Sequence, residues 1–328
     1  MIISRTPFRV SFVGGGSDLN AYYRRQPGAV VSTTIDKYMY VTINKRFDET
    51  IRISYTKTEI ADTVDQIQHA LVRQAIRLVG LDEGIEITTI ADVPAGTGLG
   101  SSSSLTVGLL NVLYAFAERF RSAEQLAQEA CQIEIDILGK PLGKQDQYAA
   151  AYGGLNYIQF NPDKTIFVDP IICKKEVKEQ LQDRLLMFYT GLRGDNSDIL
   201  VEQRRGTVSN EAKRRSLDQM VALANQMRDA LNSNDLTSFG ELLHQNWELK
   251  KRMASGISNP QIDRWYQAAQ QAGALGGKIL GAGGRGFLLL YCREGKRESV
   301  QEVMQKLDLR EFSFRFEPQG SKIIYVGG

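Results

Sequence analysis

One glycine- and serine-rich stretch, Asp92-Val-Pro-Ala-Gly-Thr-Gly-Leu-Gly-Ser-Ser-Ser-Ser-Leu105, contains the residues best suited to chemistry. An alternating segment over 84–90 predicts a strand before it, and an apolar run over 105–116 predicts a helix after it. Glycines let the backbone come close to a ligand, and the first N–H groups of a helix attract negative charge. The stretch therefore predicts an anion site, most simply for phosphate.

This loop differs from the P-loop of many nucleotide-binding proteins, which has the pattern G-x-x-x-x-G-K-[ST]. No lysine occurs between Pro94 and Leu105, so another way of binding phosphate is required. A flexible turn with a serine N-cap is the alternative interpretation of this stretch alone.

Three segments, in order, resemble the motifs of the GHMP kinases, named for galactokinase, homoserine kinase, mevalonate kinase and phosphomevalonate kinase. They are Pro7-Phe-Arg-Val-Ser-Phe-Val-Gly-Gly-Gly-Ser-Asp18, the stretch from Pro94 to Ser103, and Lys278-Ile-Leu-Gly-Ala-Gly-Gly-Arg-Gly-Phe287. Because they span residues 7 to 287, the resemblance covers nearly the whole chain. It implies an α+β, two-domain GHMP kinase fold, with a ribosomal protein S5 domain 2-like N-terminal domain, a ferredoxin-like C-terminal domain and the active site between them.

The chain of 328 residues is long enough for two domains. We predict an ATP-binding domain over 1–178 and a second domain over 179–328, divided in the polar stretch 174–183. Alternation predicts strands over 2–13 (broken at Pro7), 30–42, 51–55, 155–160, 184–189, 287–292 and 323–326, and one through Phe312, Phe314 and Phe316. Helical spacing predicts helices over 60–78, 122–137, 217–231 and 236–247.

The resemblance implies that the central loop holds ATP. The implied nucleotide-binding residues are Pro94, Gly96, Thr97, Gly98, Leu99, Gly100, Ser101, Ser102 and Ser103. It also implies that Ser102 and Glu134 lie at a Mg²⁺ ion, which prefers oxygen ligands. A solvent-exposed helix carboxylate is the alternative interpretation of Glu134.

Phosphoryl transfer to an alcohol needs a group that accepts the hydroxyl proton, and a positioned carboxylate can do this. Asp146 matches the catalytic aspartate of the family, and Arg9 matches the arginine of the first galactokinase motif, where it would orient Asp146 or stabilise the developing alkoxide. The alternative interpretation of Asp146 is a helix cap.

The first motif implies the sugar site, since its Asp18 matches an aspartate that binds sugar hydroxyls. Gly15-Gly16 stands where galactokinases carry Glu-His, which argues against galactose. The motif variant and Gly-Lys-Gln-Asp-Gln147 resemble the heptose 7-phosphate kinase branch, and less closely the fucokinases. The predicted substrate-binding residues are Gly14, Gly15, Gly16, Ser17, Asp18, Lys144, Arg193 and Gly283, with the two cations as candidates for the substrate phosphate. A kinase of another branch and a non-catalytic sugar sensor remain open.

The composition of the chain limits the classes of binding partner that we expect. The net charge of +2 gives no case for nucleic acid, and no apolar run reaches the length of a membrane helix. Three widely spaced cysteines predict reduced thiols and a cytoplasmic location, and two histidines argue against a zinc site. We therefore expect a small-molecule sugar phosphate as partner, no nucleic acid and no membrane, with a homodimer possible. The segment Gly281-Ala-Gly-Gly-Arg-Gly286 matches a dinucleotide motif, but a strand follows it, so a tight turn beside the active site is expected instead.

Overall fold

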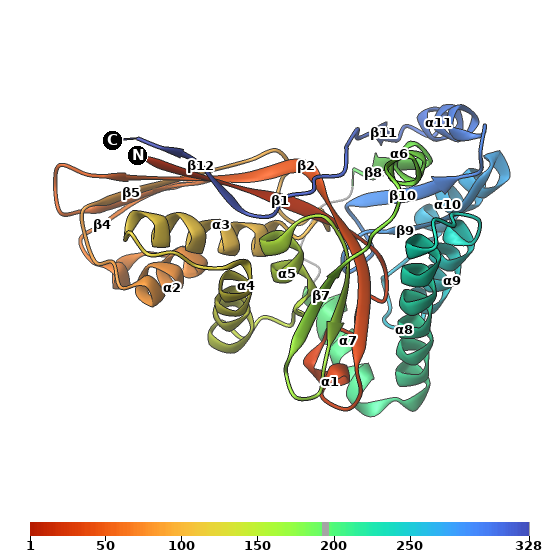
Figure 1. The fold of residues 1–328 in the computed structure, drawn as a ribbon, viewed down its shortest axis with the longest axis horizontal. Coiled ribbons are helices and arrows are strands. Elements are labelled where there is room, and N and C mark those ends of the chain that lie inside the picture. The colour runs from red at the N-terminus through yellow and green to blue at the C-terminus, as the bar shows by residue number, and fades with distance from the viewer. Residues whose placement is uncertain (192–196, 328) are drawn as a thin grey trace.

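The computed structural model describes residues 1–191 and 197–327, and two β-sheets organise them (Figure 1). The larger sheet has the strand order β12-β1-β2-β5-β3-β4, with β6 also paired to β2 and β7 paired to β6. The smaller sheet has the order β11-β8-β10-β9. The strands are β1 (Ile2–Val13), β2 (Gly28–Lys45), β3 (Ile51–Ser54), β4 (Thr58–Ala61), β5 (Ile85–Ala91), β6 (Leu155–Phe160), β7 (Ile166–Pro170), β8 (Leu185–Tyr189), β9 (Ala274–Ile279), β10 (Phe287–Cys292), β11 (Arg310–Glu311) and β12 (Lys322–Val326).

Helices cover one face of the larger sheet and surround the smaller one (Figure 1). Their bounds are α1 (Asn20–Tyr23), a 3₁₀ turn (Val64–Gln66), α2 (Ala70–Val79), α3 (Ser101–Phe116), α4 (Ala123–Cys131), a π-helix (Gln132–Ile137), α5 (Gln145–Tyr152), α6 (Lys175–Asp183), α7 (Ser197–Ser209), α8 (Glu211–Asn232), α9 (Phe239–Lys251), α10 (Pro260–Ala272) and α11 (Arg297–Lys306). None of the helices in the described part of the chain combines the length and apolarity needed to cross a membrane.

Helix α3 is central to the first half because it contacts β1, β2, α2, α4 and α5. Its apolar residues include Val107, Leu110 and Leu113, all fully buried. A helix surrounded on most sides needs apolar residues on most sides, which explains the nearly continuous apolar run predicted there. The packing holds the N-terminus of α3, and the glycine loop before it, in a fixed place.

The second half is built around β10, whose six residues are all apolar and all buried. It lies between β8 and β9, and α9 and α10 pack on β9. A strand covered on both faces is expected to be continuously apolar, so the sequence predicted it correctly. This packing places the turn between β9 and β10 next to the central loop.

Most predicted elements are confirmed, with three corrections. The helix predicted from residue 60 begins only at Ala70, because Thr58–Ala61 pair with β3 as strand β4 and Val64–Gln66 form a separate 3₁₀ turn. The strand predicted through Phe312 and Phe316 is wrong: β11 ends at Glu311, and Phe316 forms only an isolated bridge with Ile35. Strand β1 is not broken at Pro7, where the register with β2 shifts and the strand continues.

The end of the chain returns to the larger sheet. Strand β12 pairs with β1, so both termini lie at the same end of the molecule (Figure 1). The polar stretch 174–183, expected to divide the chain, forms helix α6. The division into 1–178 and 179–328 stays a prediction.

Candidate active site

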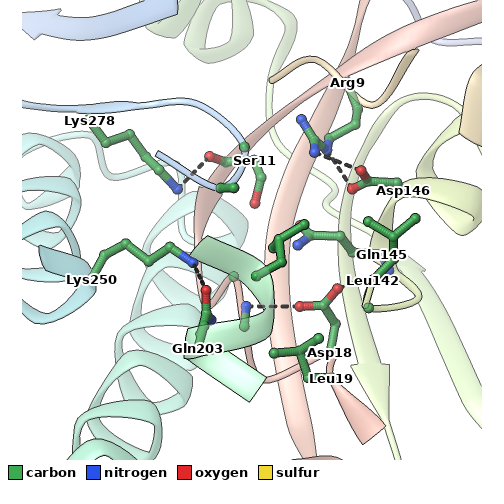
Figure 2. Close-up of a pocket in the computed structure, with 16 residues that line it drawn as sticks. Arg9, Ser11, Asp18, Leu19, Leu142, Gln145, Asp146, Gln203, Lys250 and Lys278 are labelled. Carbon is green, nitrogen blue, oxygen red and sulfur yellow. Dashed lines mark hydrogen bonds and ion pairs between the residues drawn. The ribbon is translucent and has the colours of Figure 1, made fainter. Parts of the chain in front are cut away.

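Two adjoining pockets meet where the central loop faces the turn between β9 and β10. The outer pocket, of about 420 Å³, is lined by Gly96, Gly98, Gly100, Ser101, Ser102, Ser103, Lys140, Pro141 and Ser197. The inner pocket, of about 90 Å³, is lined by Ser11, Gly15, Gly16, Asp18, Leu19, Gly143, Gln145, Gln203, Lys250 and Lys278 (Figure 2). Both are lined by Arg9, Leu142, Asp146, Leu200, Gly281 and Ala282.

The central loop makes its turn with glycines in the left-handed region. Gly96, Gly98 and Gly100 have φ values of 78°, 85° and 77°, and Gly100 is the N-cap residue of α3. Other residues adopt this conformation only with strain. The loop thus ends where the free N–H groups of a 16-residue helix begin, an arrangement suited to an anion.

The third glycine motif packs directly on this loop, as expected for a turn beside the active site. A Cβ atom on Gly98 would lie 2.4 Å from the carbonyl oxygen of Leu280, and one on Gly286 would lie 2.2 Å from that of Thr97. Neither contact can relax easily, because both partners are backbone. The two glycine-rich segments therefore position each other, although 180 residues separate them in the sequence.

Glu134 is fully buried, so its interpretation as an exposed carboxylate is wrong. One carboxylate oxygen accepts from the Ser102 hydroxyl at 2.6 Å; the other accepts from the Ser103 hydroxyl at 2.7 Å and the Gln147 amide at 2.8 Å. The Lys140 ammonium donates to Ser102 Oγ at 2.7 Å and to Glu134 Oε1 at 3.0 Å. Ser102 and Glu134 thus form an oxygen pair that already attracts a cation, which fits a Mg²⁺ ion that takes its remaining ligands from water and phosphates.

Arg9 on β1 holds Asp146 in the first turn of α5. Its Nε donates to Asp146 Oδ1 at 2.7 Å and its second terminal nitrogen donates to Oδ2 at 2.8 Å. The remaining nitrogen donates to the carbonyl of Gly98 at 2.6 Å, which ties the pair to the central loop. Such a two-pronged pair fixes the carboxylate in position and in orientation. The helix-cap interpretation of Asp146 is wrong, because α5 has its N-cap at Lys144 and no side-chain cap bond.

The first motif divides into pocket residues and supporting residues. Asp18 lines the inner pocket and accepts from the backbone N–H groups of Gly16 at 2.8 Å and Gln145 at 3.3 Å. Burial, and the nearby Asp146 charge, raise the pKa of the Asp18 carboxyl. Ser17 instead fastens the turn, since its hydroxyl donates to the carbonyl of Gly14 at 2.8 Å.

Two buried lysines in the inner pocket were not predicted. Lys250 on α9 donates to Gln203 Oε1 at 2.9 Å, and Lys278 on β9 donates to the carbonyls of Ser11 and Phe12 at 3.0 and 3.1 Å (Figure 2). Lys278 opens the third motif and could have been suspected. Lys250 lies in the run Lys250-Lys251-Arg252, where no sequence pattern distinguishes a buried cation from exposed ones.

Several predicted site residues lie elsewhere. The Lys144 ammonium lies 5.5 Å from the centre of the Tyr23 ring and does not line either pocket. Gly283 packs against Ile257 rather than lining a pocket. Pro94 and Thr97 line a separate pocket, while Leu99 is buried. Arg193 lies outside the described residues.

A glycine loop at a helix N-terminus, a buried serine–carboxylate pair and a carboxylate fixed by an arginine are the groups that phosphoryl transfer is expected to need. The family models described as the N-terminal and C-terminal domains of GHMP kinases match residues 63–154 and 227–308. The D-glycero-alpha-D-manno-heptose 7-phosphate kinase of Campylobacter jejuni is 31% identical over 98% of both chains. The L-fucokinase/L-fucose-1-P guanylyltransferase of Bacteroides fragilis is 27% identical over 90% of this chain and 35% of its own length.

Solved structures of sugar kinases have the same fold as this chain. A D-glycero-D-manno-heptose 1-phosphate kinase from Bacteroides thetaiotaomicron superimposes over 100% of both chains, with a TM-score of 0.82 and 25% identity. The Lactococcus lactis galactokinase complexed with galactose covers 98% of this chain and 94% of its own, with a TM-score of 0.78 and 19% identity, and so supports the fold alone. The chain belongs to the GHMP kinase family. The predicted two-domain GHMP kinase fold and the assignment as an ATP-dependent kinase are confirmed.

Proposed function

We propose that this kinase transfers the γ-phosphate of ATP to the anomeric hydroxyl of D-glycero-D-manno-heptose 7-phosphate, forming the 1,7-bisphosphate. The relative from Campylobacter jejuni, which carries this substrate in its name, supports the choice of sugar. The observation that carries the chemistry is Asp146, which lines both pockets and is held by Arg9. The product would serve the synthesis of GDP-heptose for surface polysaccharide, in the cytoplasm, where ATP is available.

The reaction follows from the position of Asp146 between the two pockets. The sugar oxygen, bound in the inner pocket, attacks the γ-phosphorus of ATP in the outer pocket. The bond from the γ-phosphorus to the β–γ bridging oxygen breaks, ADP leaves, and the hydroxyl proton passes to the Asp146 carboxylate. Although Arg9 donates to both carboxylate oxygens, each keeps a second lone pair for this proton. The guanidinium also lies where it would stabilise negative charge on the attacking oxygen.

Nucleotide binding is assigned to the outer pocket. The backbone of the central loop and the N-terminus of α3 would hold the phosphates, and Ser102 and Glu134 would hold Mg²⁺. When bound, the metal offsets negative charge on the phosphates. Lys140 adds a second cation on the same side, since it already contacts both proposed metal ligands.

Sugar binding is assigned to the inner pocket, which is lined with polar groups that have no partner. Within the described chain, Ser11 Oγ, Gln145 Oε1 and Gln203 Nε2 are buried without a hydrogen bond. Buried polar atoms left unpaired are costly, so they are expected to bind a polar ligand. Together with the Asp18 carboxylate, they fit a molecule with many hydroxyl groups better than an apolar acid.

A coupled assay of ADP release, run with a panel of acceptors, tests this function. We expect the highest kcat/KM with D-glycero-D-manno-heptose 7-phosphate. Best activity with heptose 1-phosphate, which the Bacteroides thetaiotaomicron kinase carries in its name, or with L-fucose would reassign the substrate. If none of the acceptors gives ADP release above background, the result would favour a non-catalytic sugar sensor and contradict the proposal.

A further inference from the structure

We propose that Lys250 and Lys278 form the subsite for a phosphate group already present on the acceptor, so that the inner pocket selects phosphorylated sugars. This inference rests on the proposed function and makes one part of it specific. It replaces Lys144 as the cation expected to bind that phosphate, because the Lys144 ammonium faces Tyr23. The two proposed lysines come from different elements, α9 and β9, which the fold brings to one wall of the pocket (Figure 2).

The two ammonium groups have donor capacity to spare. Among the residues that the structure describes, Lys250 donates one hydrogen bond, to Gln203, and Lys278 donates two, to the carbonyls of Ser11 and Phe12. An ammonium group has three donors, so two remain on Lys250 and one on Lys278. A phosphate monoester offers three acceptor oxygens and nearly two negative charges at neutral pH.

Neither ammonium is balanced by a carboxylate within 4.0 Å among the described residues. Lys250 is 5% exposed and Lys278 is 3% exposed, so solvent compensates little of their charge. Burial lowers the pKa of Lys250 to about 8 and, with the charges of Lys250 and Arg9, lowers that of Lys278 to about 7. Holding two protonated lysines in this buried pocket is costly in the ligand-free protein, and a bound dianion would offset that cost and favour their charged forms.

The formal charges around the inner pocket also favour binding of an anion. Arg9, Lys250 and Lys278 contribute up to three positive charges when protonated, and Asp18 and Asp146 contribute at most two negative ones. Since Asp146 is paired with Arg9 and the pKa of Asp18 is raised, the excess positive charge lies at the lysines. The pocket is therefore suited to an anion beside the two lysines, where Asp18 supplies only part of the opposite charge.

The γ-phosphate of ATP is the competing anion, and the arrangement of the pockets argues against it. Arg9 and Asp146 line both pockets, whereas the two lysines line only the inner one. The lysines thus line the pocket that the nucleotide loop does not line, and Asp146 lines both. An acceptor with its hydroxyl at Asp146 would direct its remote end toward them.

The test compares heptose 7-phosphate with free heptose in the wild type, Lys250→Met, Lys278→Met and the control Lys251→Met. Methionine has a similar length but no charge, and Lys251 is the neighbour of Lys250 on α9, paired with Glu248. We expect each pocket variant to lose at least tenfold in kcat/KM on the phosphorylated sugar and less than threefold on the free sugar. The control should change neither. Equal losses on both sugars would show that the lysines act structurally or on ATP, and would overturn the inference while leaving the proposed function intact.

A binding measurement covers the case in which heptose 7-phosphate is not the substrate. With the nucleotide site filled by a non-hydrolysable ATP analogue and Mg²⁺, inorganic phosphate is titrated and followed by ³¹P NMR. We expect saturable binding to the wild type and the Lys251→Met control, and at least tenfold weaker binding to both pocket variants. Binding that is absent in the wild type, or unchanged in the variants, would overturn the inference. Thermal melting without ligand confirms that the variants fold.

Discussion

Replacing Asp146 with asparagine tests the catalytic role of the carboxylate separately from its role in folding. The change keeps the shape and one acceptor for Arg9, but it removes the carboxylate that would take the hydroxyl proton. General bases contribute roughly 10²–10⁴-fold, so we expect kcat to fall by that amount, which corresponds to about 3–5 kcal/mol in the barrier. Nucleotide affinity should be retained, because the central loop and Glu134 are unchanged.

The same substitution has a smaller effect on stability. It removes one of the two charge-assisted bonds to Arg9, at 2.8 Å, each of which contributes about 1.5–3 kcal/mol. The arginine side chain is 5% exposed and that of Asp146 is 21% exposed, so solvent screens only part of the lost pairing. We expect the free energy of unfolding to fall by about 2 kcal/mol.

Steady-state kinetics with the preferred acceptor, ADP titration and thermal melting measure these effects. Asp136→Asn is the matched control, since Asp136 is an exposed residue on the neighbouring helical segment and should leave all three measurements unchanged. A loss of kcat below threefold in a folded Asp146→Asn protein would refute the assignment of Asp146 as the base. A loss of nucleotide affinity as large as the loss of kcat would instead place Asp146 in the nucleotide site.

Three further predictions follow from the same geometry. Glu134→Gln should raise the Mg²⁺ concentration needed for half-maximal activity by at least tenfold relative to Asp136→Asn, and an unchanged Mg²⁺ dependence would remove Glu134 from the metal site. Gly98→Ala should abolish ATP binding in a titration, because its Cβ would lie 2.4 Å from a backbone carbonyl oxygen. Gly80→Ala is the control, since Gly80 has a φ of 76° but open space around it, and this change should only lower the melting temperature by a few degrees. The free energy of unfolding of the ligand-free protein should rise as the pH rises above 7, by up to about 1.4 kcal/mol per pH unit. The reason is that Lys278 loses its proton near pH 7 in the folded state but keeps it to about pH 10.5 in the unfolded state. Chemical denaturation at several pH values should show a smaller slope in Lys278→Met, and an equal slope would contradict the lowered pKa.

Part of the site could be predicted because its chemistry is local. The glycines of the central loop stand next to the helix they precede, so a strand, a loop and a helix N-terminus could be recognised from adjacent residues. Resemblance to family motifs predicts Glu134, Asp146 and Arg9. The structure places Arg9 and Asp146 in both pockets, and the buried Glu134 bonds to Ser102, which lines the outer pocket.

The sequence is less informative where the outcome depends on distant parts of the chain. Lys144 is adjacent to the helix that carries Asp146, but its ammonium faces Tyr23. Lys250 is 104 residues from Asp146 in the sequence and lines the same pocket. Phe312 and Phe316 alternate like a strand, yet a strand needs continuous backbone pairing. The ladder with β8 covers Arg310 and Glu311, one further hydrogen bond joins Phe312 to Met187, and Phe316 forms an isolated bridge with Ile35.

Resemblance of three motifs to a known family is enough to predict the fold family and the class of reaction. The strand, glycines and helix around residues 92–105 predict an anion site, because these preferences are local. Which lysines line the inner pocket could be seen only in the tertiary structure. Lysine is usually exposed, and its burial depends on which elements pack around it. Here α9 and β9, folded against the end of β1, place two lysines in a pocket that no contiguous segment of the chain could form.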